Sequence, residues 1–263
     1  YIDNARLERG GVNFSLNALI LEAHRKAGAL YALLGEESEA ERCERHATRM
    51  RTALRRRFFS GETGLFLDRQ ASDGPELATP STVGNILALL FGIADRRQHA
   101  RILDFVCERM LDNFHGASPA RTRDYEVSPY FAFFALDALY QHGRPEIALR
   151  FMRRYWNYML RRGAWTCWEF FSQTCSLCHA WSSAPTHYLT TKVLGIEPVE
   201  PGNPNLFRIN PEAGALRWAE GTYPHPDGPI EIRWEKKGEV IHLDFSAPDS
   251  VEILLGRGDS PPV

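Results

Sequence analysis

The chain has 263 residues, long enough for one large domain or for an ordinary domain with a smaller one. Hydrophobic residues make up 44% and charged residues 24%, the balance of a globular protein. The net charge of −2 gives no broad positive field, and no apolar run reaches the roughly 20 residues that span a bilayer, so neither nucleic acid nor a membrane is an expected partner. Because the chain starts at Tyr1 rather than at Met, we expect it to be a piece of a longer protein, and the sequence assigns neither its compartment nor its oligomeric state.

Helical periodicity extends from residue 12 to about residue 195, and the helices come in pairs. In each pair the first member is largely apolar and the second is amphipathic and charged. The predicted helices are 16–34, 37–59, 80–93, 96–113, 128–142, 145–162 and 179–194, with a loop at 61–80 that contains a short extended piece at 64–68.

A helix that is apolar all round is buried, whereas an amphipathic helix has one face in water. The alternation therefore predicts an inner and an outer layer of helices, as in an (α/α) toroid, although seven helices would complete only part of six hairpins. An α-solenoid is the alternative, but the sequence has no fixed-period repeat.

After Gly195 the pattern changes from helical to extended. Four prolines break any helix between residues 198 and 211, and short alternating runs follow at 206–209, 230–234, 240–245 and 251–255. We therefore expect a mainly α protein in which residues 1–195 belong to the toroid. Residues 196–263 are expected to form a small, incomplete antiparallel β-sandwich.

The five cysteines indicate no disulfide framework, because their number is odd in a chain of this size. Cys175 and Cys178 have half the spacing of a zinc site, but a second pair is missing, and neither His179 nor His187 supplies a usual ligand spacing. We interpret the cysteines as structural thiols and expect no metal and no cofactor.

The residues with the clearest chemistry lie in Trp165-Thr166-Cys167-Trp168-Glu169 and, nine residues later, in Cys178-His179-Ala180-Trp181. Aromatic rings bind the apolar faces of sugars, and a carboxylate beside them can activate water. The pattern predicts carbohydrate chemistry at Glu169, with His179 nearby. Trp168 and Trp181 either line a sugar pocket or pack between helices.

Five stretches together resemble bacterial α-L-rhamnosidases of glycoside hydrolase family 78. They are Tyr1-Ile2-Asp3, Ser128-Pro129-Tyr130-Phe131, Leu177-Cys178-His179-Ala180-Trp181-Ser182-Ser183-Ala184-Pro185, Leu194-Gly195-Ile196 and Leu216-x-Trp218-Ala219 with its continuation to Trp234. The resemblance covers essentially the whole chain as the C-terminal portion of such an enzyme. It implies an (α/α)6 toroid followed by a β-sandwich.

The resemblance also implies an inverting glycosidase, in which a general acid and a general base flank the scissile bond. Glu169 matches the general base, and His179 matches a histidine that contacts the sugar. Trp168, Trp181 and Asp3 are the further expected substrate-binding residues. The family's general acid lies in a segment upstream of this chain, and Glu126 does not match it, so the chain alone is expected to be inactive.

One position departs from the family pattern: Asn4 follows Asp3, where a tryptophan is usual. That tryptophan helps form the wall against the methyl face of the deoxy sugar, so the departure bears on rhamnose specificity. The alternatives are a six-hairpin glycosidase with another sugar specificity and a non-catalytic carbohydrate-binding protein.

Overall fold

The computed structural model describes residue 3 and residues 11–70, 79–112, 126–200 and 202–256. The helices are α1 (Phe14–Leu33), α2 (Glu37–Phe58), α3 (Thr82–Leu90), α4 (Arg96–Asp112), α5 (Ala132–Gln141), α6 (Pro145–Leu160), the 3-10 helix η1 (Ala180–Ser182), α7 (Ala184–Tyr188) and the π-helix η2 (Leu189–Leu194). The strands are β1 (Val12–Asn13), β2 (Phe59–Ser60), β3 (Leu65–Phe66), β4 (Arg69–Gln70), β5 (Ile196–Pro198), β6 (Leu206–Ile209), β7 (Trp218–Tyr223), β8 (Ile230–Lys237), β9 (Val240–Ser246) and β10 (Glu252–Leu255).

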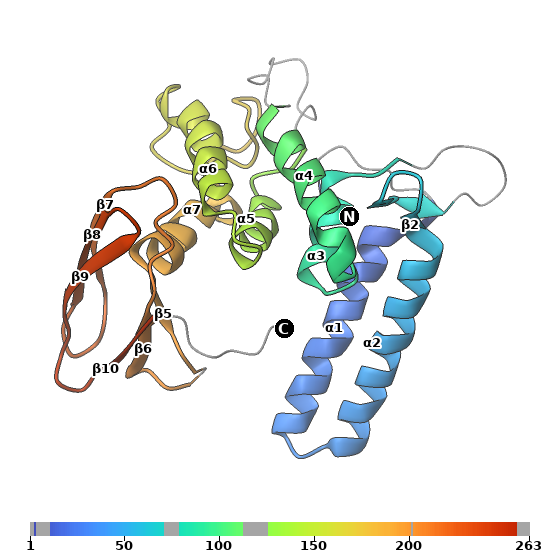
Figure 1. Ribbon diagram of the computed structural model, residues 1–263, viewed down its shortest axis with the longest axis horizontal. Coiled ribbons are helices and arrows are strands. Elements are labelled where there is room, and N and C mark those ends of the chain that lie inside the picture. Colours follow the sequence, from blue (N-terminus) through green and yellow to red (C-terminus); the bar gives the residue numbers. More distant parts are fainter. Residues whose placement is uncertain (1–2, 4–10, 71–78, 113–125, 201, 257–263) are drawn as a thin grey trace.

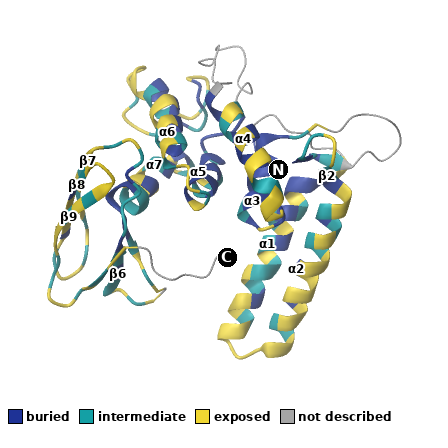
Figure 2. Ribbon diagram, in the orientation of Figure 1, coloured by how far each residue is buried: buried dark blue, intermediate teal, exposed yellow. Residues whose placement is uncertain are grey.

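The helices form antiparallel hairpins, α1 with α2, α3 with α4 and α5 with α6 (Figure 1). In α3 every residue but Leu90 is buried, whereas α2 turns most of its residues to solvent (Figure 2). The predicted alternation of inner and outer helices is therefore confirmed. The inner helices α1 and α3 begin at side-chain caps, since Asn13 accepts from Leu16 N and Ser81 accepts from Gly84 N, each at 3.0 Å.

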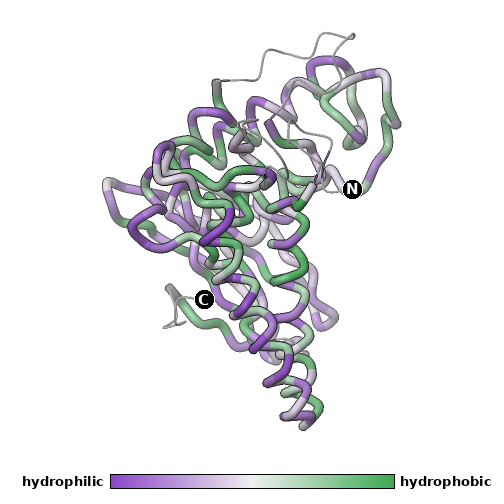
Figure 3. The backbone as a smooth tube through the Cα atoms, turned by 90° about the vertical axis from the view of Figure 1, so that its right-hand side faces the viewer, coloured by the Kyte–Doolittle hydropathy of each residue, from purple (hydrophilic) through white to green (hydrophobic). Residues whose placement is uncertain are grey.

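The α1–α2 hairpin projects from the body, and β5 to β10 lie at the opposite side of the molecule (Figure 1). In Figure 3, hydrophobic and hydrophilic positions alternate along the projecting end of the hairpin. One stripe of α1 leaves Leu16, Ile20 and Leu30 exposed, and Leu34 continues it past the helix end. Within the described ranges, three hairpins and α7 thus form an open arc with an apolar edge.

The last helical segment differs from the single helix expected at 179–194. It is divided into η1, α7 and η2, and the α-helical part starts at Ala184. Pro185 explains this start, because proline lacks the N–H that an interior helical position would use and is tolerated in the first turn. The segment ends at Gly195, whose φ of +91° places it in the left-handed region.

The C-terminal strands form two three-stranded sheets, in the orders β7-β8-β9 and β10-β6-β5. All pairs are antiparallel except β6 with β10, which is parallel and differs from the expected antiparallel module. Apolar residues of both sheets share a core with η2, and Trp234 is its largest fully buried side chain. The Nε1 of Trp234 donates to the Val193 carbonyl at 2.9 Å, which ties the sheets to the helices.

Candidate active site

The starts of the inner helices α1 and α3 are held together by Asp68. The backbone N–H of Phe14 donates to the Asp68 carbonyl at 2.8 Å. The Asp68 carboxylate accepts from the Ser81 hydroxyl and from the Ser81 N–H at 3.3 Å. A buried carboxylate needs such donors to offset its lost hydration, so Asp68 serves as a frame for the two helix starts.

The next pair of helix starts, α3 and α5, is joined in the same way. Thr82 Oγ1 donates to Glu126 at 2.7 Å, and Arg109 donates to the other oxygen of this buried carboxylate at 3.3 Å. Two residues later, the Ser128 N–H donates to the Asp3 carboxylate at 3.1 Å. Asp3 is fully buried, and it fixes the loop that leads into α5.

The segment between α6 and α7 brings the two predicted motifs side by side. Glu169 N–H donates to the Ser176 carbonyl at 2.9 Å, and His179 N–H donates to the Cys167 carbonyl at 2.8 Å. The chain therefore doubles back like a hairpin. The Glu169 carboxylate also accepts from the Ser176 N–H at 3.3 Å, a long hydrogen bond that leaves the side chain half-exposed.

Trp181 connects the backbone of Glu169, the His179 ring and the neighbouring helix. Its Nε1 donates to the Glu169 carbonyl at 3.2 Å, and its ring stacks on His179 with centroids 3.9 Å apart. Tyr130, from the start of α5, lies 5.5 Å from the Trp181 ring, and Phe170 lies 6.5 Å away. Glu169, His179, Trp181 and Tyr130 are thus brought together by contacts between two inner-helix starts.

His179 has an unused hydrogen-bonding atom at this position. Its Nδ1 is buried and has no hydrogen-bond partner among the described residues. A buried polar atom without a partner is costly, and a sugar hydroxyl could satisfy it by donating or accepting. This atom is the clearest structural indication of a ligand beside Glu169.

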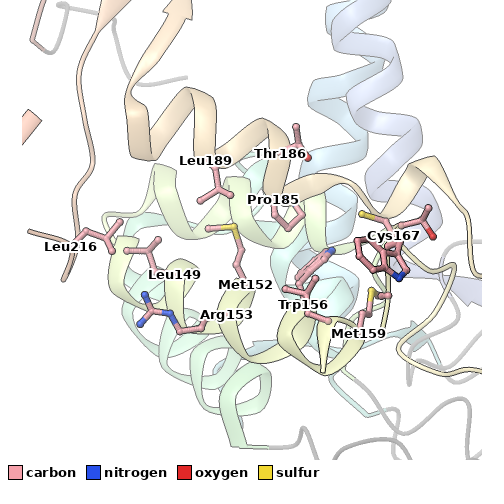
Figure 4. Close-up of a pocket in the computed structure, with 14 residues that line it drawn as sticks. Leu149, Met152, Arg153, Trp156, Met159, Cys167, Pro185, Thr186, Leu189 and Leu216 are labelled. Atoms are coloured by element: carbon pink, nitrogen blue, oxygen red, sulfur yellow. The ribbon is translucent and has the colours of Figure 1, made fainter. Parts of the chain in front are cut away.

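The two other tryptophans of the motif lie in opposite environments. Trp168 is buried, and its ring packs in the core of the helical part. Its backbone carbonyl accepts from the Ser182 hydroxyl. Trp165 is 98% exposed. Trp165 and Cys167 border an apolar cavity of about 490 Å³ between α6 and α7, shown in Figure 4, which Glu169 does not line.

Sequence reasoning assigned no role at the site to Tyr130 or Phe170. Tyr130 lies about fifty positions before Trp181, so no local spacing connects them, although Ser128-Pro129-Tyr130 marks the start of an inner helix. Asn4 lies outside the described residues.

All five cysteines are free thiols. In the described part of the chain, no three histidine, cysteine or acidic residues are grouped as a metal site would require. None of the helices found there has the length and apolarity to cross a membrane.

Layered helical hairpins followed by a C-terminal β domain are the arrangement of the six-hairpin glycosidase class. The family comparison is more specific. The model of the bacterial alpha-L-rhamnosidase 6 hairpin glycosidase domain matches residues 12–193, and that of the bacterial alpha-L-rhamnosidase C-terminal domain matches residues 195–256. The chain belongs to the bacterial α-L-rhamnosidase family of glycoside hydrolases.

Individual relatives agree with this assignment. The chain is 23% identical over 261 residues to an alpha-L-rhamnosidase of Alteromonas sp. (strain LOR), covering 92% of this chain and 26% of the relative. The crystal structure of a GH78 family rhamnosidase of Bacillus sp. GL1 is 26% identical with a TM-score of 0.82, covering 97% of this chain and 27% of that one. An α-L-rhamnosidase structure from Dictyoglumus thermophilum shares the fold at 18% identity with a TM-score of 0.71, covering 90% of this chain and 26% of that one. The chain thus spans about a quarter of the length of these relatives.

Proposed function

We propose that the protein containing this chain hydrolyses terminal α-L-rhamnosides with inversion, and that Glu169 is the general base. The observation that carries the proposal is the buried Nδ1 of His179, which has no partner among the described residues. The His179 ring stacks on Trp181, whose Nε1 donates to the Glu169 carbonyl. Membership of the α-L-rhamnosidase family supplies the substrate class.

An inverting base must be ionised and must reach a water molecule on the far side of the sugar ring. Glu169 suits this role, since its backbone is held by Ser176 and Trp181 while its carboxylate stays half-exposed. The general acid would stand about 6.5–9.5 Å from the base in an inverting enzyme. We place it in a segment upstream of this chain, so the chain alone would bind without turnover.

Four further residues complete the proposed half-site. His179 would hydrogen-bond a sugar hydroxyl through Nδ1, and Trp181 would hold both Glu169 and the His179 ring. Trp168 and Asp3, both buried, would hold the segments that contain Ser182 and Ser128, with which they form hydrogen bonds. Binding by these residues requires no cofactor.

The test is the hydrolysis of nitrophenyl α-L-rhamnoside by the full-length protein and its Glu169→Gln variant. Loss of a general base should lower kcat by about 10²–10⁴-fold, whereas Glu239→Gln, in the exposed turn between β8 and β9, should leave kcat unchanged. NMR of the first-formed sugar anomer reports inversion directly. A fall of less than about tenfold for Glu169→Gln would show that Glu169 is not the base.

The substitution of Asn4 for the usual tryptophan favours one alternative, a related glycosidase with another sugar specificity. A panel of nitrophenyl glycosides separates the two. If another glycoside is hydrolysed and its kcat falls in the Glu169→Gln variant, Glu169 keeps its proposed role as general base, but the substrate is not a rhamnoside. Rhamnose binding without turnover of any glycoside would instead indicate a carbohydrate-binding protein.

A further inference from the structure

One face of α6 and the two residues that follow the helix carry a concentration of arginines that the proposed reaction does not use. They line a surface groove of about 510 Å³ together with Leu111, Asn157 and Tyr158. Residues three and four apart in a helix lie on the same face, so these side chains gather along one line. The arginines are Arg150, Arg153, Arg154, Arg161 and Arg162.

Two of the five have a structural task. Arg154 donates to the Leu111 carbonyl, and Arg162 lies 3.7 Å above the Tyr158 ring and donates to the Tyr158 carbonyl at 3.3 Å. These contacts hold the walls of the groove in place.

The other three arginines, Arg150, Arg153 and Arg161, are exposed and form no ion pair with any residue that the structure describes. The helix dipole favours cations at the C-terminal end of a helix, which accounts for Arg161, the C-cap residue of α6. It does not account for Arg150 and Arg153 in the middle of α6. In a chain of net charge −2, this is an unneutralised positive stripe.

The groove adjoins the apolar cavity between α6 and α7. Arg153, labelled in Figure 4, also lines the apolar cavity that Trp165 borders, so this side chain is shared by the groove and the cavity. Trp165 follows Arg162 by three residues, and its exposed ring offers a platform for the apolar face of a sugar. Cys167 lines the same cavity, and its carbonyl accepts from the His179 N–H at 2.8 Å, which links the cavity wall to the candidate site.

We propose that this groove binds an acidic polysaccharide segment, which it presents to the active site. Guanidinium groups match carboxylate and sulfate oxygens with two parallel hydrogen bonds, and both anions are therefore suitable. From Arg150 to Arg161 the stripe is about 16 Å long at 1.5 Å per residue, which fits a few sugar units. The proposal rests on the glycosidase function and adds a negatively charged substrate class to it.

The test is equilibrium binding by the full-length protein to four probes: polygalacturonate oligomers, dextran sulfate, neutral dextran and a single-stranded oligonucleotide. The triple variant Arg150→Gln/Arg153→Gln/Arg161→Gln should weaken binding of the anionic polysaccharide about tenfold, the loss expected for three exposed ion pairs. Added salt should weaken wild-type binding as well, because exposed charges are screened.

Polygalacturonate and dextran sulfate distinguish carboxylate from sulfate recognition, and preferential binding of either supports the proposal. The matched control Arg49→Gln/Arg56→Gln/Arg57→Gln removes three exposed charges from α2 and should change Kd by less than twofold. Three results would overturn the proposal. They are an equal loss of affinity in both triple variants, binding of neutral dextran as tight as that of the anionic polysaccharides, and equally tight binding of the oligonucleotide. Because the readout is binding, the result does not depend on rhamnoside hydrolysis.

Discussion

Trp181 is the residue whose replacement most directly tests how the site is held together. The substitution Trp181→Phe keeps an aromatic ring to stack on His179 and deletes the Nε1 donor to the Glu169 carbonyl. Its expected effect therefore concerns the position of Glu169 rather than the presence of an aromatic wall.

The structure allows the size of that effect to be worked out. The 3.2 Å hydrogen bond contributes about 0.5–1.5 kcal/mol to stability, a small part of the total for a domain of this size. Its influence on rate is larger, because a displacement of about 1 Å at a reacting group costs up to about 10²-fold. We expect kcat to fall about 10- to 100-fold while KM changes little, since His179 and its stacked ring remain.

The assay is nitrophenyl α-L-rhamnoside hydrolysis by the full-length protein, with kcat, KM and the pH profile measured together. Trp234→Phe is the matched control, because it deletes the same kind of bond, from Nε1 to the Val193 carbonyl, far along the chain from Glu169. The control should lower the melting temperature and leave kcat per folded molecule unchanged. Equal kcat in wild type and Trp181→Phe, or an equal fall in both variants, would refute a positioning role for Trp181.

Two further predictions concern the helix starts and the response to pH. The variant Thr82→Val loses a 2.7 Å hydrogen bond to the buried Glu126 carboxylate, so its free energy of unfolding should fall by about 1.5–3 kcal/mol, measured by urea unfolding. An unchanged urea midpoint would contradict the role of Glu126 in joining the starts of α3 and α5. Burial, with the nearby His99 and Arg144, lowers the pKa of His142. As the pH falls, His142 is therefore protonated in the unfolded chain before it is protonated in the folded one, so stability should decrease as the pH drops through about 6.5. The variant His142→Gln should flatten that part of the curve of melting temperature against pH.

Much of the fold could be predicted because burial follows simple periodicities. The apolar composition of α3 and the charged surface of α2 identified the inner and outer layers directly. The division of the last helix was predictable only in part: Pro185 limits where an α-helix can begin, but the π-helical turn that follows depends on packing against the β domain. The parallel pairing of β6 with β10 joins segments about 45 residues apart, a distance over which the sequence pattern carries no information on direction.

The candidate site could be predicted where its residues are close in the chain. Glu169, His179 and Trp181 fall within thirteen residues, and a hairpin-like turn brings them together. Tyr130 comes from another helix start and meets Trp181 only through tertiary packing. The burial of Trp168 could not be predicted from the sequence either. A tryptophan in such a motif can line a sugar pocket or fill the core, and the surrounding sequence is the same in both cases.

Hydrogen bonding separates the structural carboxylates from the proposed catalytic one, which sequence could not do. Asp68 and Glu126 are buried, and each accepts from a hydroxyl that fixes it to a neighbouring helix start. Asp3 is buried as well and accepts from a backbone N–H. Glu169 accepts one long bond from Ser176 and is half-exposed. Among these four carboxylates, Glu169 is therefore the one with the exposure that contact with a water molecule requires.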